Sequence, residues 1–280
     1  MKGTFMFFLK RSLKTVLAAL IFVFSHMVTA EGATQKQFDD LPWKNSGTGE
    51  IAGQATINIP KDLRFLDPIG TEQFLKLSGN LPTPNEYLIE SRTKGWFALF
   101  EYSDDGHVKD DETIDPDALL KSLIAGNEAA NEERKKNQLP LVFLDGWHIA
   151  PRYDKQNNRL EWATKVRNEQ NQIFVNYTTK ILGRSGYVSA TLVSEPNSLD
   201  GDIADFKNKL KAFDFIPGQR YAEFRDGDKM AAYGLGALVV GGAAAAASKG
   251  GFKAIGALIL AGIAAVGTFI KKIFGKNKDA

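Results

Sequence analysis

Histidine and carboxylate side chains are the groups in this sequence best suited to acid–base chemistry. A histidine beside a carboxylate accepts a proton near neutral pH, and two carboxylates roughly 5 to 10 Å apart cleave glycosidic bonds. Spacing along the chain does not establish such distances, so the sequence assigns no catalytic residue. It leaves open an envelope hydrolase that would use His148 with carboxylates. The carboxylates considered for it are Asp104, Asp105 and Asp145.

The densest acidic stretch, residues 101–117, has part of the spacing of a calcium-binding EF-hand loop. Counted from Glu101, the matching positions are Ser103, Asp105, Gly106 and Glu112. However, the first position is glutamate where aspartate is usual, and the ninth is Lys109. The residues before the stretch also have a strand pattern instead of a helical one. We therefore interpret the stretch as an acidic loop and expect no metal site.

A four-residue motif, Gly183-Arg184-Ser185-Gly186, resembles the nucleophile elbow of hydrolases, in which a serine stands between a strand and a helix. Its second glycine comes one residue too early, and a strand pattern follows it where a helix is required. The motif therefore predicts a turn. No glycine-rich loop opens a predicted helix, and no basic stripe alternates with aromatic residues. We accordingly expect no nucleotide cofactor and no nucleic-acid partner.

Aromatic residues within strands usually pack in the core of a sheet, although they would also suit the wall of a ligand groove. An isolated histidine in such a strand is more often a hydrogen-bonded structural residue than a general base. Core packing is therefore the favoured interpretation for the tryptophans, and a hydrogen-bonded structural role is favoured for the histidine. The residues concerned are Trp96, Trp147, Trp162 and His148.

The composition excludes several classes of site. The chain has 280 residues, with 35 basic and 33 acidic side chains and no cysteine. The lack of cysteine excludes disulfides, thiolate zinc sites, cysteine nucleophiles and a lipid anchor on cysteine. Three histidines argue against a multi-histidine metal centre. The balanced charge gives no general attraction to nucleic acids.

The first 30 residues have the organisation of a secretory signal peptide. Basic residues precede an apolar run over residues 16–24, and Val28-Thr29-Ala30 supplies the small residues that a signal peptidase requires. The apolar run is about half as long as a membrane-spanning helix of roughly 20 residues. We therefore predict a signal peptide over residues 1–30, with an uncleaved N-terminal anchor as the alternative. Both place the following domain in a bacterial periplasm.

The C-terminal end contains two uncharged stretches, residues 230–247 and 254–270, joined by a short polar turn. The second is rich in isoleucine and leucine and predicts a transmembrane helix. The first is mostly alanine and glycine, so it is either a second span or a helix packed against the other. The basic tail, residues 271–280, favours one span, whereas the stretch lengths favour a hairpin. Residues 230–270 are thus expected to contact the lipid bilayer, and their small residues four apart permit self-association.

The middle of the chain is expected to form one α+β domain over residues 51–229, after a flexible leader over residues 31–50. Short polar turns favour an antiparallel meander, with flanking helices on one face of the sheet. The Asp-Gly step at residues 105–106 predicts a hairpin, and Asp115 with Pro116 predicts a helix start. Predicted strands cover residues 54–59, 96–102, 141–149, 159–166, 172–182 and 187–194; predicted helices cover 71–78, 115–136 and 199–213.

A series of short motifs runs through the middle of the chain and into the apolar end. The motifs are Gly95-Trp96-Phe97, Phe100-Glu101-Tyr102, the stretch from Asp104 to Asp111, Gly146-Trp147, Pro151-Arg152-Tyr153-Asp154, Leu160-Glu161-Trp162-Ala163, Asn176-Tyr177, Leu182 to Gly186, Pro217 to Tyr221, Gly227-Asp228-Lys229 and Tyr233-Gly234-Leu235. Their order resembles an uncharacterised family of membrane-anchored bacterial proteins, domain of unknown function 2167. The resemblance covers nearly the whole chain after the leader and implies an exported, anchored domain with no established activity. No catalytic residue is therefore carried over, and the resemblance implies that an aromatic residue is usual at the position of His107.

The function predicted from these features is that of a non-enzymatic binding or interaction module tethered to the bacterial inner membrane. Its expected partners are the bilayer, other envelope proteins and further copies of itself. The alternative is an envelope hydrolase that uses His148 and carboxylates. A deep pocket that joins His148 to buried carboxylates would favour the enzyme, whereas a flat or filled surface would favour the binding module.

Overall fold

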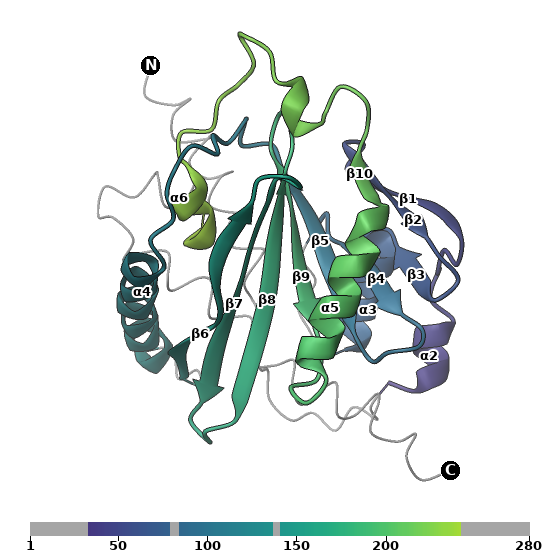
Figure 1. Cartoon of the computed structure of the whole chain (residues 1–280). Coiled ribbons are helices and arrows are strands. Elements are labelled where there is room, and N and C mark those ends of the chain that lie inside the picture. Colours follow the sequence, from purple (N-terminus) through teal and green to yellow (C-terminus); the bar gives the residue numbers. More distant parts are fainter. Residues whose placement is uncertain (1–32, 79–83, 137–140, 242–280) are drawn as a thin grey trace, which may run out of the picture.

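The computed structural model describes residues 33–78, 84–136 and 141–241. In this part of the chain, helices flank two antiparallel sheets, which is the predicted α+β class (Figure 1). The helices are α2 (Gln35–Asp39), α3 (Pro68–Leu77), α4 (Pro116–Lys136), α5 (Leu199–Lys209) and α6 (Leu235–Val239), with the 3-10 turns η1 (Leu210–Ala212) and η2 (Tyr221–Glu223).

The larger sheet has seven strands in the order β3-β4-β5-β9-β8-β7-β6, and the smaller has three in the order β1-β2-β10. Strands β6 to β9 follow one another along the chain and pair antiparallel, which confirms the predicted meander. The strands are β1 (Gly47–Ile51), β2 (Ala55–Ile59), β3 (Leu63–Leu66), β4 (Tyr87–Ser91), β5 (Phe97–Ser103), β6 (Val142–Asp154), β7 (Arg159–Asn168), β8 (Ile173–Leu182), β9 (Tyr187–Val193) and β10 (Phe213–Phe215).

Helices cover both faces of the larger sheet, because neighbouring side chains of a strand point to opposite faces. On β5, Phe97 packs against Phe74 of α3, with ring centroids 5.1 Å apart. Phe100 points to the other face and packs against Phe206 of α5, at 6.2 Å. The expectation of helices on one face is therefore wrong, since strands that are apolar on both faces need cover on each.

Helix α4 packs on the face of the larger sheet that is opposite to the face covered by α5. Leu160 and Trp162 of β7 belong to the apolar cluster that contains Leu123 of α4. Glu161, which stands between them, points to the other face and pairs with Lys207 of α5. Helix α5 lies across the front of β9 and leaves β8, β7 and β6 uncovered beside it (Figure 1).

Helix α4 begins where the sequence predicts. The side chain of Asp115 accepts hydrogen bonds from the backbone N–H groups of Asp117 and Ala118, at 3.1 and 3.0 Å. These are two of the N–H groups that a helix start leaves without an internal partner, so the aspartate stabilises the first turn. The predicted helix at residues 71–78 is confirmed as well, as α3.

The hairpin predicted after the Asp-Gly step is wrong. Gly106 has the expected positive φ of 105°, but the chain does not return as a strand beside β5. Instead, His107 forms an isolated bridge with Met230, and its backbone N–H donates to the carbonyl of Lys229 at 2.8 Å. Strand β5 pairs instead with β4 and with β9. Because β9 is distant along the chain, a local turn signal does not reveal it as a partner.

Helix α5 ends earlier than the predicted boundary at residue 213. Phe206 and Leu210 of the predicted apolar stripe are buried, as is Phe213. However, η1 follows the helix, and Phe213 then pairs with Ile57 of β2 in the smaller sheet. The stripe is thus correct as a set of core residues, although its last member belongs to a strand.

The residues predicted as a flexible leader, 31–50, are largely structured from residue 33 onward. Thr34 caps α2, and Phe38 within it is 3% exposed. The rings of Phe38 and Trp43 both pack edge-on against Phe74, with centroids 5.4 and 6.1 Å apart. Strand β1 then joins the smaller sheet. Two isolated aromatic residues in a polar stretch produce no periodic pattern, so the sequence conceals this packing.

The start of the predicted membrane segment also differs from expectation. Residues 230–241 contain only the five-residue helix α6, and their leucine and valine side chains are buried in the cluster shared with α4 and β7. No helix among the described residues is long and apolar enough to cross a membrane. The rest of that segment, the basic tail and the predicted signal peptide over residues 1–30 lie outside the described residues.

Candidate functional site

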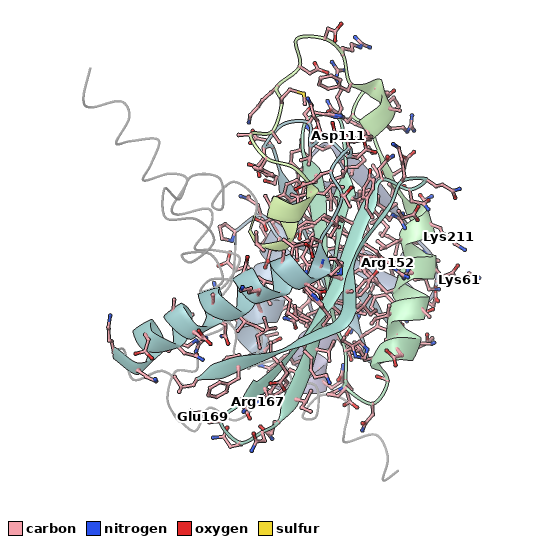
Figure 2. The ribbon with its side chains drawn as sticks, turned by 60° about the vertical axis from the view of Figure 1, so that its left-hand side comes forward. Lys61, Asp111, Arg152, Arg167, Glu169 and Lys211 are labelled. Carbon is pink, nitrogen blue, oxygen red and sulfur yellow. The ribbon has the colours of Figure 1, made fainter. Side chains whose placement is uncertain are left out.

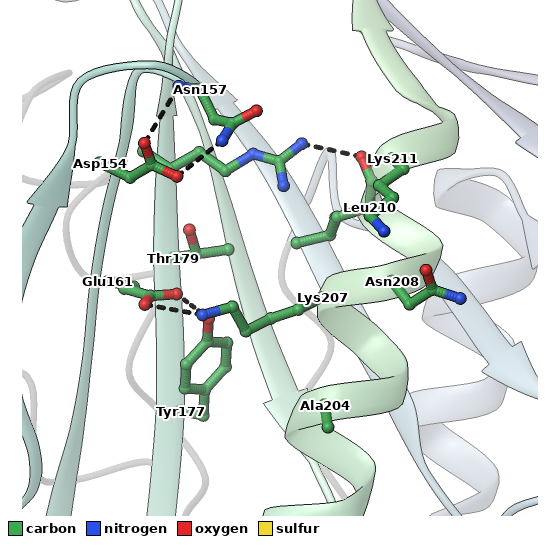
Figure 3. Close-up of a pocket in the computed structure, with 11 residues that line it drawn as sticks. Asp154, Asn157, Glu161, Tyr177, Thr179, Ala204, Lys207, Asn208, Leu210 and Lys211 are labelled. Atoms are coloured by element: carbon green, nitrogen blue, oxygen red, sulfur yellow. Dashed lines mark hydrogen bonds and ion pairs between the residues drawn. The ribbon is translucent and has the colours of Figure 1, made fainter.

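A pocket of about 290 Å³ lies beside α5, where the helix leaves β7 and β8 uncovered (Figure 3). Its walls combine the larger sheet, the turn between β6 and β7, and the last turns of α5 with η1. Most of the lining side chains are polar or charged. The lining residues are Asp154, Asn157, Arg159, Glu161, Tyr177, Thr179, Ala204, Lys207, Asn208, Leu210 and Lys211.

Strand register brings the pocket residues of the sheet together. Arg152, Glu161 and Thr179 are successive register partners across β6, β7 and β8. Asp154 and Arg159 form the next row on the same face, since alternate residues of a strand share a face. These side chains point toward α5, whereas Leu160 between the rows packs under α4. The apolar residues of β7 therefore fix which polar residues face the pocket.

Glu161 is the buried centre of this site. One carboxylate oxygen accepts from Lys207 Nζ at 2.8 Å and from Arg152 Nε at 2.5 Å, and the other accepts from the Tyr177 hydroxyl at 2.6 Å. Burial alone would raise the pKa of Glu161, but these donors together hold that pKa below its ordinary value. The same burial and the adjacent carboxylate raise the pKa of Tyr177, so its hydroxyl stays protonated as a donor. Glu161 is thus an ionised anchor for α5 instead of a free general base.

We expect Glu161→Gln to lower the free energy of unfolding by about 2 kcal/mol at neutral pH, the range for hydrogen bonds to a charged group. Because the folded-state pKa of Glu161 is lowered, its contribution is complete above the pKa of the unfolded chain and is lost as the pH falls through the folded-state value. The deficit of the variant should therefore shrink below a pH of about 4.

Urea unfolding of both proteins between about pH 7 and pH 3 measures this deficit. Glu128→Gln, at an exposed position on α4, is the matched control and should leave stability unchanged. A deficit that stays constant over the whole pH range would contradict the assignment of an ionised Glu161.

Two of the residues that line the pocket each carry a buried polar atom without a hydrogen-bond partner among the described residues. One is Thr179 Oγ1, on a side chain that is 1% exposed, and the other is Arg159 Nε. The Arg159 guanidinium is held from its other side, where Nη2 donates to the carbonyl of Leu210 at 2.8 Å. Burial lowers the pKa of Arg159 from its very high ordinary value, but an arginine stays charged. In the view of Figure 3, Thr179 lies between the Glu161–Lys207 pair and the pair formed by Asp154 and Asn157.

The pocket carries net positive charge. Three cationic side chains and two carboxylates line it, and Arg152 gives Glu161 a further cationic partner. The second carboxylate, Asp154, is exposed and accepts from the Asn157 side chain at 2.6 Å and the Gln156 backbone N–H at 3.0 Å. These bonds, the Asn157 side chain foremost, hold the pKa of Asp154 below its ordinary value. The arrangement therefore offers fixed donors and positive charge to an acceptor-rich small molecule.

The structure does not bring together the residues considered for a hydrolase. His148 Nε2 lies 2.8 Å from Asp200 Oδ1, which links β6 to the first turn of α5. Each of the three candidate carboxylates has another partner. Asp145 pairs with Arg167 at 2.9 Å, Asp105 accepts from the hydroxyls of Tyr187 and Tyr233, and Asp104 lies 3.7 Å from Lys229.

The acidic loop with partial EF-hand spacing has a structural role in the described part of the chain. Glu112 accepts the backbone N–H of Gly236 at 2.9 Å, at the start of α6. Together with Asp105, it ties the loop to the segment that follows η2. No group of acidic and histidine side chains among the described residues is arranged to hold a metal ion.

The four-residue motif that resembles a nucleophile elbow is a turn between β8 and β9, as predicted. Its backbone closes through the N–H of Gly183, which donates to the carbonyl of Gly186 at 2.8 Å. Arg184 forms a two-pronged pair with Asp228, at 2.7 and 2.8 Å, which lowers the pKa of Asp228 to about 2. The Ser185 hydroxyl donates to the side chain of Gln219 at 3.1 Å. The turn thus holds the segment after β10 and is no nucleophile site.

The tryptophans agree with core packing. Trp96 and Trp162 are 0% and 5% exposed, and Trp147 donates its ring N–H to the carbonyl of Pro116 at 3.1 Å. None of the three lines the pocket. His107 is sandwiched between the rings of Tyr221 and Phe224, with centroids 4.4 and 4.2 Å away. This stacking suits the aromatic residue that the family resemblance places there.

Sequence reasoning did not single out the pocket residues, although one signal for them exists. Glu161 interrupts a run of buried apolar residues on β7, and Thr179 stands between the buried Tyr177 and Ile181 on one face of β8. A polar residue at a buried strand position must have a partner or a function. That argument identifies Glu161 and Thr179, but the partners on α5 lie far along the chain and appear only in the fold.

Comparison with known proteins gives one family and a distant structural likeness. The sequence model of one protein family, described as "Protein of unknown function (DUF2167)", matches residues 44–271. No curated protein matches the chain. Among solved structures, the solution structure of cyanobacterial PsbP (CyanoP) from Synechocystis sp. PCC 6803 is similar at 10% identity and a TM-score of 0.34. That likeness covers 69% of this chain and 98% of that one.

Proposed function

The chain belongs to the DUF2167 family of proteins of unknown function, and from that premise we propose that it is an exported, membrane-anchored envelope protein whose central domain binds a small ligand. The binding site is the pocket beside α5, and the domain holds its ligand without chemical conversion. The observation that carries the proposal is the pair of unpartnered buried polar atoms in that pocket, Thr179 Oγ1 and Arg159 Nε.

The proposed location rests on the two ends of the sequence. Basic residues, an apolar run and Val28-Thr29-Ala30 follow one another as in a signal peptide, which directs the domain to the periplasm. The uncharged residues 254–270 supply the anchor in the inner membrane. Because residues 230–240 pack on the domain, we place the contact with the bilayer after Gly241. Other envelope proteins and further copies of the chain are the remaining proposed partners.

Energetics supports ligand binding at the pocket. A buried polar group without a partner costs about 1 to 3 kcal/mol, which is a substantial part of the stability of an ordinary domain. Thr179 stands on β8 next to Ile181 and Tyr177, where an apolar residue would remove this cost. A ligand that forms a hydrogen bond with this hydroxyl would remove the cost, and the bond would make binding specific for ligands with a matching polar group.

The test compares two adjacent threonines of β8 in the full-length protein held in nanodiscs. Thr179 faces the pocket, whereas Thr178 points to the opposite face and pairs in register with Trp162. Thr179→Val and Thr178→Val remove the same hydroxyl from the same strand. The unfolding temperature of each protein is measured with inorganic phosphate, succinate, glucose or choline. At least one of these probes should raise the unfolding temperature of the wild type and of Thr178→Val, but not of Thr179→Val.

Two results would overturn the proposal. One is a stabilising effect that is equal in both variants, because the ligand would then bind elsewhere. The other is the absence of any effect from all four classes of probe, which would mean that the pocket holds only solvent.

A further inference from the structure

We propose that the ligand of this pocket is a small dissolved oxyanion, a molecule with a carboxylate or phosphate group that Arg159 and Lys207 bind at the floor formed by Thr179. This inference rests on the proposed function and names the class of its ligand. It is carried by the donors in the pocket, by their charge and by the way in which Glu161 is occupied.

The free donors have the chemistry that recognises an oxyanion. Arg159 lines the pocket and is fixed by the carbonyl of Leu210, and its buried Nε has no partner among the described residues. A guanidinium held in this way loses little further conformational freedom on binding, and its planar edge suits carboxylate and phosphate oxygens. The Thr179 hydroxyl adds a neutral donor with no competing partner in the described residues. Lys207 and Lys211 supply charge from the α5 side.

Glu161 does not repel such a ligand, because its own charge is already compensated. It has two cationic partners, Arg152 and Lys207, and its second oxygen is taken by the Tyr177 hydroxyl. The ammonium group of Lys207 has three N–H donors, and its hydrogen bond to Glu161 uses one of them. The others remain for the ligand. A neutral ligand would leave the excess positive charge of the pocket uncompensated.

The dimensions limit the ligand to a compact molecule. A volume of about 290 Å³ is at the lower end of the range for small-molecule pockets. This volume is similar to that of roughly ten water molecules in liquid water. Succinate and inorganic phosphate are small enough for this space. Lys211 on η1 is exposed and lines the pocket.

The experiment measures the Kd of succinate and of inorganic phosphate by calorimetry, with glucose as the neutral probe, on the full-length protein in phosphatidylcholine nanodiscs. Arg159→Gln should raise the Kd of the anions at least tenfold, which corresponds to about 1.4 kcal/mol. Lys211→Gln, on an exposed side chain, should raise it by a smaller factor without a change in fold. Arg167→Gln is the matched control, because Arg167 lies on the same strand but pairs with Asp145 at the other end of the sheet (Figure 2).

Each outcome separates this inference from the proposed function. Glucose binding that is lost in Thr179→Val but unaffected by Arg159→Gln and Lys211→Gln would overturn the oxyanion and leave the binding module intact. No binding of any probe through Thr179 would overturn both. Stabilisation by nanodiscs of phosphatidylglycerol without dissolved anion, lost in Lys211→Gln, would assign the oxyanion to a lipid headgroup and overturn the dissolved ligand. An anion affinity that falls equally in Arg167→Gln would show only a general charge effect and would overturn the assignment to Arg159.

Discussion

A chain that ends at Gly218 should fail to unfold cooperatively, whereas a chain that ends at Gly241 should do so in a single transition. The residues between them supply four aliphatic side chains that are at most 2% exposed. Those side chains are Leu235, Leu238, Val239 and Val240. At about 1.5 to 3 kcal/mol for each buried side chain, their loss removes roughly 6 to 12 kcal/mol. That is comparable with the whole stability of a typical domain, about 5 to 15 kcal/mol.

Both chains begin at residue 31, and their unfolding in urea is followed by far-ultraviolet circular dichroism and tryptophan fluorescence. The double variant Leu235→Ala/Leu238→Ala in the chain that ends at Gly241 tests the same packing without a truncation, and it should lose several kcal/mol. A soluble chain ending at Gly218 with one sharp transition would contradict the structure. It would instead show that the domain folds without the residues that follow Gly218.

The sequence predicts that the domain ends at residue 229 and that a membrane segment begins at residue 230, because hydropathy alone does not distinguish a membrane segment from a buried one. Residues 230–247 carry no charge, and the polar turn with Ser248 and Lys249 follows them. An uncharged stretch of this kind can be a membrane helix or a segment packed in the core of a domain, and hydropathy does not distinguish the two. The discriminating contact is distant: Glu112, in the acidic loop before α4, accepts the backbone N–H of Gly236. Nothing in the local pattern of either stretch predicts that the two meet.

The predicted elements were correct where periodicity and turn residues agree. Helix α4 has both an Asp-Pro start and a regular apolar face, and the meander from β6 to β9 has short polar turns. Strands β3 and β4 escape the same reasoning. They are short, and Arg64 and Glu90 stand opposite each other within them as an ion pair. Charged residues in the middle of short strands cancel the alternation on which a strand prediction depends.

The pocket was beyond prediction for a different reason. Searching for catalytic side chains draws attention to His148 and to three aspartates, Asp104, Asp105 and Asp145, and none of these four residues lines the pocket. Glu161 and Thr179 meet through strand register, and Lys207 reaches them only because α5 crosses the sheet beside β8. Sequence patterns indicate which face of a strand is buried, but they do not indicate which helix covers it.

Gly186→Ala should lower the free energy of unfolding by about 3 kcal/mol or more, at or beyond the upper end of the range for overpacking. A Cβ atom at Gly186 would lie 1.9 Å from the backbone oxygen of Ser103 and 2.9 Å from its carbonyl carbon. Backbone atoms cannot turn aside as a flexible side chain does. The turn is further fixed against its neighbour, since Gly106 donates its N–H to the carbonyl of Ser185 at 3.1 Å. The added methyl group must therefore separate β9 from β5 at that end.

Gly201→Ala is the matched control, because a Cβ atom there meets nothing within 4 Å and the position lies inside α5. Alanine favours a helix over glycine, so this variant should gain roughly 0.5 to 1 kcal/mol. Urea unfolding of both variants measures the contrast. If Gly186→Ala were as stable as the wild type, Ser103 could not lie against this turn. In this structure the close contact with the Ser103 backbone explains the glycine at position 186, without any reacting serine. A stable Gly186→Ala variant would remove that explanation.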